Sequence, residues 1–185
     1  GEPMQGVVFE AFRDGKSIGY FTTGADGKFT LPYAENGTYV FREYHTLAGY
    51  VLSKDPIIIE HTTDGNTDII IDNMVQKDFT VVKVDSQSKK PIEGVTFRIW
   101  RDGVLLGDYK TDKDGKITLT KAPAGTYKVQ ETATLQEYIL NDKPVEIEHT
   151  SDKPTEITIE NTKKPGLSIQ KIDAETRKPL ANAVF

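Results

Sequence analysis

The sequence predicts an all-β fold, built as tandem seven-stranded β-sandwich modules that repeat every 88 residues. Two observations lead to this prediction. Residues of the same type recur at one fixed offset through almost the whole chain, with no net insertion between the copies. Between them lie short runs rich in β-branched and aromatic residues, separated by Asp-Gly and Asn-Gly turn signals, and no run shows helical periodicity.

The fixed offset divides the chain into two tandem units and the start of a third. The shared positions include Pro3, Pro91 and Pro179; Phe9, Phe97 and Phe185; Tyr39 and Tyr127; and the endings Ile71–Asn73 and Ile159–Asn161. We therefore expect unit one over residues 1–76, lacking its first strand, and a complete unit two over residues 77–163. Residues 164–185 would supply the first strand and the start of unit three.

The complete unit contains seven β-like runs in order. Phe79–Val84 alternates between its two faces, and Val95–Arg101 ends in an Asp-Gly pair typical of a tight hairpin. A second Asp-Gly pair and a Pro-Ala-Gly turn bound the runs that follow. After the first two strands we expect Leu105–Lys110, Lys116–Leu119, Thr126–Glu131, Val145–His149 and Glu156–Asn161.

Unit one repeats this order from Val7–Arg13 to Asp68–Asn73, but the counterpart of the first strand would lie before Gly1. Gly166–Asp173 is expected to be a first strand, with Leu167, Ile169 and Lys171 on one face. The linkers at 74–78 and 162–165 are short, so the units should stack as a fairly stiff rod.

Composition restricts the classes of function. The net charge of −5 and the pI near 5.3 argue against nucleic acid or an anionic membrane as the partner, and no apolar run is long enough for membrane insertion. The chain has no cysteine, so a covalent staple would have to be of another kind. Its first residues look like an internal cut, and we expect the chain to be a piece of a longer protein.

Three strands of unit two end an apolar row on a polar group. Lys83 shares a face with Phe79 and Val81, and Glu131 shares one with Tyr127 and Val129. Asn161 follows Ile157 and Ile159 in the same way. Burying such groups singly costs several kcal/mol, so an amine, a carboxyl and an amide are expected to meet.

The chain also resembles the CnaB-type domains, which are Ig-like or prealbumin-like sandwiches of Gram-positive surface adhesins and pilins. The residues that carry the resemblance are Lys-Val-Asp at 83–85, the run Lys90–Phe97, Gly-Thr-Tyr at 125–127, Gln-Glu-Thr at 130–132 and the terminal Asn161. Such domains typically carry a spontaneous Lys–Asn isopeptide bond promoted by a buried glutamate.

The resemblance implies a role for each misfit. Lys83 matches the nucleophile, Asn161 the electrophile and Glu131 the catalyst of an isopeptide bond. In unit one Glu43 and Asn73 match, with no lysine in the chain to join them. In unit three only Lys171 matches. One molecule's Gly166–Asp173 could therefore complete unit one of the next, and even bond Lys171 to Asn73.

Physical chemistry supports the same roles. Desolvation lowers the pKa of an amine and raises that of a carboxyl group. Lys83 would then be a neutral nucleophile, and a protonated Glu131 could polarise the Asn161 amide and pass a proton to departing ammonia. Fixed proximity supplies effective molarities of roughly 10⁵–10⁸ M. The reaction would run once, so no enzymatic turnover is expected.

Simpler interpretations exist for these and other residues. A Lys–Glu pair is most often a partly solvated salt bridge, and an Asn at a strand end is often a turn former. His61 and His149 are expected to be surface strand histidines, and residues 111–115 a turn rather than a calcium loop. Trp100 is expected to be a core or edge aromatic. We expect no metal and no cofactor.

The sequence thus predicts a stalk module of an extracellular, cell-wall-attached adhesin or pilin-like protein, with a Lys–Asn isopeptide bond. Its partners would be neighbouring repeats of the same protein, while other domains of the parent would contact a host-matrix ligand. The alternative is a host-matrix or glycan-binding module that uses its own loops. The two units share no aromatic cluster or basic patch in those loops.

Overall fold

The structure is a computed structural model that describes residues 2–182 and 184. Gly1, Ala183 and Phe185, at the outer limits of the first and third predicted units, lie outside the described residues. Within the described part, the chain forms eleven β-strands and no helix, which confirms the all-β prediction. It follows that no described helix could cross a membrane.

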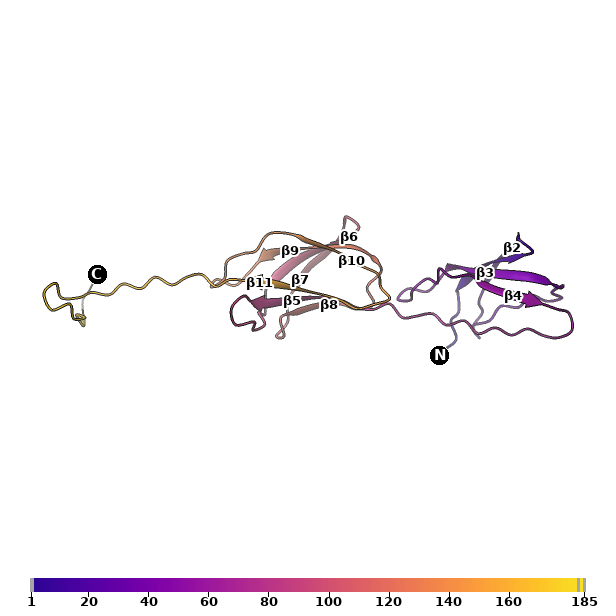
Figure 1. The fold of residues 1–185 in the computed structure, drawn as a ribbon, viewed down its shortest axis with the longest axis horizontal. Coiled ribbons are helices and arrows are strands. Elements are labelled where there is room, and N and C mark those ends of the chain that lie inside the picture. Colours follow the sequence, from indigo (N-terminus) through magenta and orange to yellow (C-terminus); the bar gives the residue numbers. More distant parts are fainter. Residues whose placement is uncertain (1, 183, 185) are drawn as a thin grey trace.

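Unit two is the predicted seven-stranded sandwich, with strand bounds within one or two residues of those expected. One sheet has the order β10-β9-β6-β7 and the other β11-β5-β8, and Figure 1 shows the two layers face to face. The strands are β5 (Phe79–Asp85), β6 (Thr96–Arg101), β7 (Val104–Lys110), β8 (Lys116–Leu119), β9 (Gly125–Ala133), β10 (Val145–His149) and β11 (Thr155–Asn161).

The core of unit two fills the space between these sheets. Phe79 of β5 stacks on Tyr127 of β9 with ring centroids 4.4 Å apart, and Val81, Phe97 and Val129 are fully buried around them. Every second residue of β5, β9 and β11 faces inward, as the alternating burial of each strand shows. This alternation brings the polar ends of the three rows into one interior.

Strand β5 holds the three-stranded sheet together. It pairs antiparallel with β8 and parallel with β11, and neither of these strands has another ladder partner. The parallel register sets Lys83 opposite Ile159 and Asp85 opposite Asn161. The inward-facing Lys83 and Asn161 are therefore diagonal neighbours on the inner face of the sheet.

Unit one forms a single sheet of order β2-β1-β3-β4. Its strands are β1 (Val8–Arg13), β2 (Lys16–Thr22), β3 (Gly37–His45) and β4 (Ile57–His61). The predicted strand Asp68–Asn73 is wrong, because these residues make no ladder. The physical reason is visible in unit two, where the equivalent β11 pairs only with β5, and unit one has no strand in that place.

The predicted strand Gly166–Asp173 is wrong for the same reason. It leads away from unit two without a ladder, apart from an isolated bridge between Ile172 and Pro179. Its exposed backbone has no neighbouring strand among the described residues to complete the hydrogen bonds. An alternating sequence is therefore insufficient to form a strand here.

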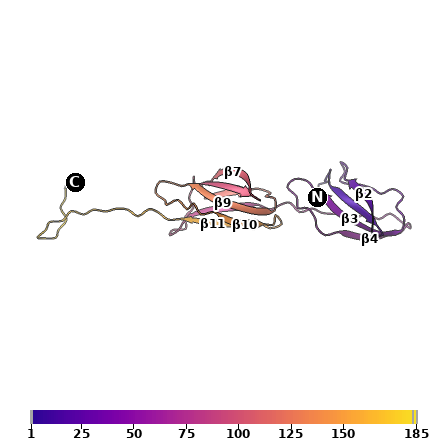
Figure 2. The same ribbon diagram turned by 90° about the horizontal axis from the view of Figure 1, so that it is seen from above.

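The two units lie end to end, and residues 164–182 extend from the far end of unit two (Figure 1). The perpendicular view in Figure 2 shows the same order. The linker between the units is hydrogen-bonded to both: Gln76 N donates to Gly49 O at 2.8 Å, and Lys77 N donates to Ser151 O at 2.7 Å. These backbone bonds limit the freedom of the short linker.

Candidate functional site

The three polar misfits of unit two meet in the core, as the strand pattern predicts. Lys83 comes from β5, Asn161 from β11 and Glu131 from β9 of the facing sheet. Lys83 Nζ donates to Asn161 Oδ1 at 2.6 Å and lies 2.8 Å from Glu131 Oε2. Asn161 Nδ2 donates to Glu131 Oε1 at 2.6 Å. Each of the three side chains therefore touches the other two.

The site is closed to solvent. The exposed fractions of Lys83, Glu131 and Asn161 are 0%, 1% and 1%. Burial lowers the pKa of the Lys83 amine, while the neighbouring Glu131 carboxyl partly opposes this effect. The ring of Phe97 lies 5.8 Å from Lys83 Nζ and contributes to the apolar surroundings. A lowered pKa increases the fraction of lysine that is a free amine, which is the nucleophilic form.

A fourth residue, Thr134, belongs to this site and was missed by the sequence analysis. Its Oγ1 accepts a hydrogen bond from Asn161 Nδ2 at 2.8 Å, so both amide protons of Asn161 have an acceptor. This contact orients the amide with its oxygen toward Lys83. The signal that could have identified it is the repeat, because Thr46 of unit one occupies the equivalent position.

The turn before β8 supports the backbone of Lys83. Lys83 N donates to Gly115 O at 2.7 Å, and a Cβ atom on Gly115 would lie only 2.5 Å from Lys83 O. Gly115 also has a φ of +70°, which L-residues with a side chain rarely adopt. The loop at 111–115 is the predicted turn, since Asp112 Oδ1 accepts from Asp114 N and Lys116 N.

The strand that carries Lys83 ends in a second fixed turn. Asp85 Oδ1 accepts hydrogen bonds from the backbone N–H groups of Ser88 and Gln87 and from the Ser88 hydroxyl. The bonds from Ser88 are the main reason that the pKa of Asp85 falls to about 2. The ionised Asp85 carboxylate therefore anchors the end of β5 two residues beyond the amine.

Unit one contains the same arrangement without a lysine. Asn73 Nδ2 lies 2.7 Å and 2.9 Å from the two carboxylate oxygens of Glu43 and 3.2 Å from Thr46 Oγ1. The backbone N–H of Ser53 donates to Glu43 Oε2 at 2.7 Å. Among the described residues, no lysine amine lies within ion-pair distance of Glu43. The sixth predicted residue, Lys171, is exposed in the C-terminal segment, away from both sites.

The prediction that His149 is a surface histidine is wrong. Only 1% of its surface is exposed, and its ring stands edge-on to Phe79 and Tyr127. Its ring nitrogens contact Thr155 Oγ1 at 2.8 Å and Ala122 O at 3.1 Å. These two partners satisfy both nitrogens of a neutral imidazole and so permit its burial. The repeat motif identified the residue, but not the loop over it.

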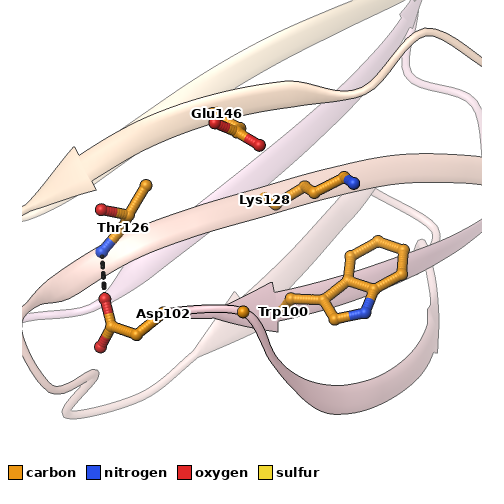
Figure 3. A pocket seen from close by; sticks show the side chains of 6 residues that line it. Trp100, Asp102, Thr126, Lys128 and Glu146 are labelled. Carbon is orange, nitrogen blue, oxygen red and sulfur yellow. Dashed lines mark hydrogen bonds between the residues drawn. The ribbon is translucent and has the colours of Figure 1, made fainter.

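Trp100 is neither in the core nor on an edge strand. It lies half-buried on the outer face of the inner strand β6, beside a surface hollow of about 380 Å³ that Figure 3 shows. Lys128 Nζ lies 5.0 Å from the centre of the indole ring, and Asp102 Oδ1 accepts from Thr126 N at 2.9 Å. The aromatic face that a sugar ring would need is therefore already in contact with a cation.

Comparison with known proteins identifies the domains. A family model described as "SpaA: Prealbumin-like fold domain" matches residues 1–74 and 77–163. The chain is 30% identical over 141 residues to serine-aspartate repeat-containing protein D of Staphylococcus aureus strain Newman. That alignment covers 63% of this chain and 11% of the relative, so the chain spans only about a tenth of the relative's length.

Solved structures of similar fold come from three bacteria. The Bacillus anthracis TIE protein has a TM-score of 0.48 at 24% identity, covering 88% of this chain and 31% of that one. Shaft pilin SpaA from Lactobacillus rhamnosus GG has a TM-score of 0.43 at 20% identity, covering 90% and 91%. The Streptococcus agalactiae minor pilin GBS52 also has a TM-score of 0.43 at 20% identity, covering 92% and 88%.

Proposed function

Because the chain belongs to the SpaA prealbumin-like fold domain family, we propose that it is a stalk segment of a Gram-positive cell-surface adhesin or pilin-like protein. In this proposal, unit two is closed by an autocatalytic isopeptide bond between Lys83 and Asn161. The observation that supports it most is the 2.6 Å contact between Lys83 Nζ and Asn161 Oδ1 in a fully buried site that also holds Glu131.

The simpler alternative is a permanent buried ion pair between Lys83 and Glu131. Removing two charges from water has a desolvation cost that mutual attraction often fails to offset, so such pairs are poor stabilisers. Here Glu131 Oε2 has no well-aligned hydrogen bond, although it lies close to the amine. Moving one proton from Lys83 to Glu131 removes both buried charges and produces the reactive pair.

The reaction follows from this geometry. The free amine of Lys83 attacks Asn161 Cγ, which is bonded to the oxygen it already contacts. Glu131 takes a proton from the attacking nitrogen and gives one to Asn161 Nδ2, which faces its Oε1 at 2.6 Å. The Cγ–Nδ2 bond breaks and ammonia leaves as the new Cγ–Nζ bond forms. Loss of ammonia makes the step practically irreversible.

The bond would join the strand that opens unit two to the strand that closes it. β5 and β11 are parallel neighbours, so force applied to the two chain ends shears their ladder. A ladder of hydrogen bonds yields at a rate set by the unfolding barrier, whereas a covalent amide does not. In a cysteine-free chain, this bond would provide the covalent closure that a disulfide provides elsewhere.

The location and partners belong to the same proposal. The chain would be extracellular and attached to the cell wall through its parent protein, with neighbouring repeats as its immediate partners. The similarity to a pilin and to a surface repeat protein supports this placement. Contact with a host-matrix ligand would come from other domains of the parent. Since Lys128 covers the Trp100 ring, we do not favour a glycan-binding role for unit two.

Intact-mass measurement of the purified chain tests the proposal. One bond removes one ammonia, so the mass should be lower than the sequence value by about 17 Da. Asn161→Asp should instead lose one water, about 18 Da, because the leaving group changes while the product amide stays the same. Glu131→Gln should remain at its full sequence mass. A wild-type chain at its full sequence mass would overturn the proposal.

A further inference from the structure

Unit one holds a half-site that lacks only its amine. Glu43, Asn73 and Thr46 contact one another as Glu131, Asn161 and Thr134 do in unit two. Two of the three components are strand-borne in unit two, whereas Asn73 sits on a segment without a ladder. The acceptor half of a cross-link is thus already assembled.

The place of the missing strand is marked by uncovered apolar side chains. Ile69 is 39% exposed, while its unit-two equivalent Ile157 is 8% exposed beneath β5. Phe29 and Leu31, which correspond to the inner and outer ends of the β8 ladder, are only partly buried. The segments at 28–31 and 67–73 are both without ladders in unit one. Their counterparts β8 and β11 flank β5 in unit two.

The C-terminal segment has the properties of the strand that would fit there. Leu167 and Ile169 are 89% and 67% exposed and correspond by the repeat to Phe79 and Val81 of β5. Lys171 corresponds to Lys83 and is exposed. The turn after it is already formed, since Asp173 Oδ1 accepts from Thr176 N at 2.7 Å, as Asp85 does from Ser88.

The segment cannot reach unit one of its own chain. Unit two lies between them, and the segment leaves from the end of unit two that is opposite to unit one (Figures 1 and 2). The occupant that fits is therefore the same segment of a second copy. Contacts of this kind are head-to-tail, and repeated contacts generate an open chain of molecules.

We propose that Leu167–Lys171 of one molecule inserts as the missing first strand into unit one of another, where Lys171 forms an isopeptide bond with Asn73. The unit-two register then sets Lys171 beside Ile71, parallel to residues 67–73, and Ile169 beside Phe29 of the antiparallel neighbour. The chemistry rests on the function proposed for Lys83. The strand insertion rests on the uncovered groove alone.

The covalent step balances in the same way as in unit two. Lys171 Nζ, as a free amine, bonds to Asn73 Cγ, and the Cγ–Nδ2 bond of Asn73 breaks. Glu43 accepts a proton from the attacking nitrogen and delivers one to the departing ammonia. Ser53 N must release Glu43 Oε2, which it holds at 2.7 Å, so that the carboxyl can face the incoming amine as Glu131 Oε2 faces Lys83.

Mixing two single-defect variants tests this proposal in the full-length chain. Lys171→Ala retains the acceptor and loses the amine, while Asn73→Ala retains the amine and loses the acceptor. Neither alone should form a covalent species, but the mixture should give a covalent heterodimer that survives denaturing electrophoresis. Its mass should be the sum of the two chains less one further ammonia, about 17 Da. Peptide mapping should identify the Lys171–Asn73 linkage.

The controls separate this proposal from the function of unit two. Lys178→Ala changes another exposed lysine of the same segment and should act as a full donor. Because both mixed variants keep Lys83, each should still show its internal mass loss whether or not they join. Absence of the heterodimer at high concentration, association without a covalent bond, or a linkage from any other lysine would overturn the proposal.

Discussion

Lys83 Nζ lies 2.6 Å from Asn161 Oδ1, although 78 residues separate the two in the sequence. Both are inside the sandwich, on adjacent parallel strands, with Glu131 touching each from the opposite sheet. This contact determines the stability and chemistry expected of unit two. It would close a loop that contains nearly the whole domain, which is where a cross-link restricts the unfolded chain most.

Lys83→Ala should abolish the mass loss and lower stability strongly. In the chain-entropy model, a cross-link that closes a loop of this length is worth about 4–5 kcal/mol, which corresponds to a fall in Tm of roughly 15–30 °C. Calorimetry and protease digestion measure the effect. Asn161→Ala is the matched control, since it removes the bond and keeps the Lys83–Glu131 pair. Equal Tm values for wild type and both variants would contradict a covalent closure.

Thr134→Val should slow bond formation because the Asn161 amide loses the acceptor that orients it. The expected result is an incomplete loss of ammonia soon after synthesis or refolding, followed by slow completion, as measured by intact mass over time. Thr134→Ser restores the hydroxyl and should restore the rate, which a purely packing role would not require. Equal rates for the valine and serine variants would remove Thr134 from the site.

Gly115→Ala should destabilise unit two and reduce the cross-linked fraction. Its Cβ would lie 2.5 Å from Lys83 O, so the backbone that carries the amine would have to move. Gly103→Ala is the matched control, because Gly103 also has a positive φ of +78° but has no atom within 4 Å of an added Cβ. It should cost only about 1–2 kcal/mol for the left-handed conformation and leave cross-linking complete. Similar losses in both variants would mean that the close approach to Lys83 is unimportant.

Asp85 should make the uncross-linked domain sensitive to acid. Its folded-state pKa is depressed from 3.8 to about 2, so the ionised carboxylate stabilises the fold above pH 4, and this stabilisation is lost as the pH falls toward 2. Denaturant unfolding of the Lys83→Ala variant between pH 7 and pH 2 measures the slope. Adding Asp85→Asn should flatten it below pH 4.

Asp173→Asn is the control for this pH dependence. Asp173 makes the same turn contacts in the C-terminal segment, and the bonds from Thr176 likewise lower its pKa. It lies outside the sandwich, so its substitution should leave the acid sensitivity of unit two unchanged. An unchanged slope in Asp85→Asn would assign the acid sensitivity to other carboxylates.

The repeat and the alternation made much of the site predictable. Lys83, Glu131 and Asn161 each broke an apolar row, and a strand fixes the face of every second residue, so all three had to point inward. Thr134 gave no such signal because it lies beyond the end of β9, where alternation no longer applies. Its contact depends on how the loop after β9 returns over β11.

The sequence by itself determined the repeat, the seven strands of unit two and the residues that share its interior, because turn signals and side-chain alternation are local properties of the chain. Only the tertiary structure decided whether a strand-like segment becomes a strand. Asp68–Asn73 and Gly166–Asp173 alternate as well as β11 and β5 do, yet each lacks a neighbouring ladder. The burial of His149 was also decided by a distant partner, Ala122 O. A ladder hydrogen bond needs a second segment in place, and no pattern within one segment can supply it.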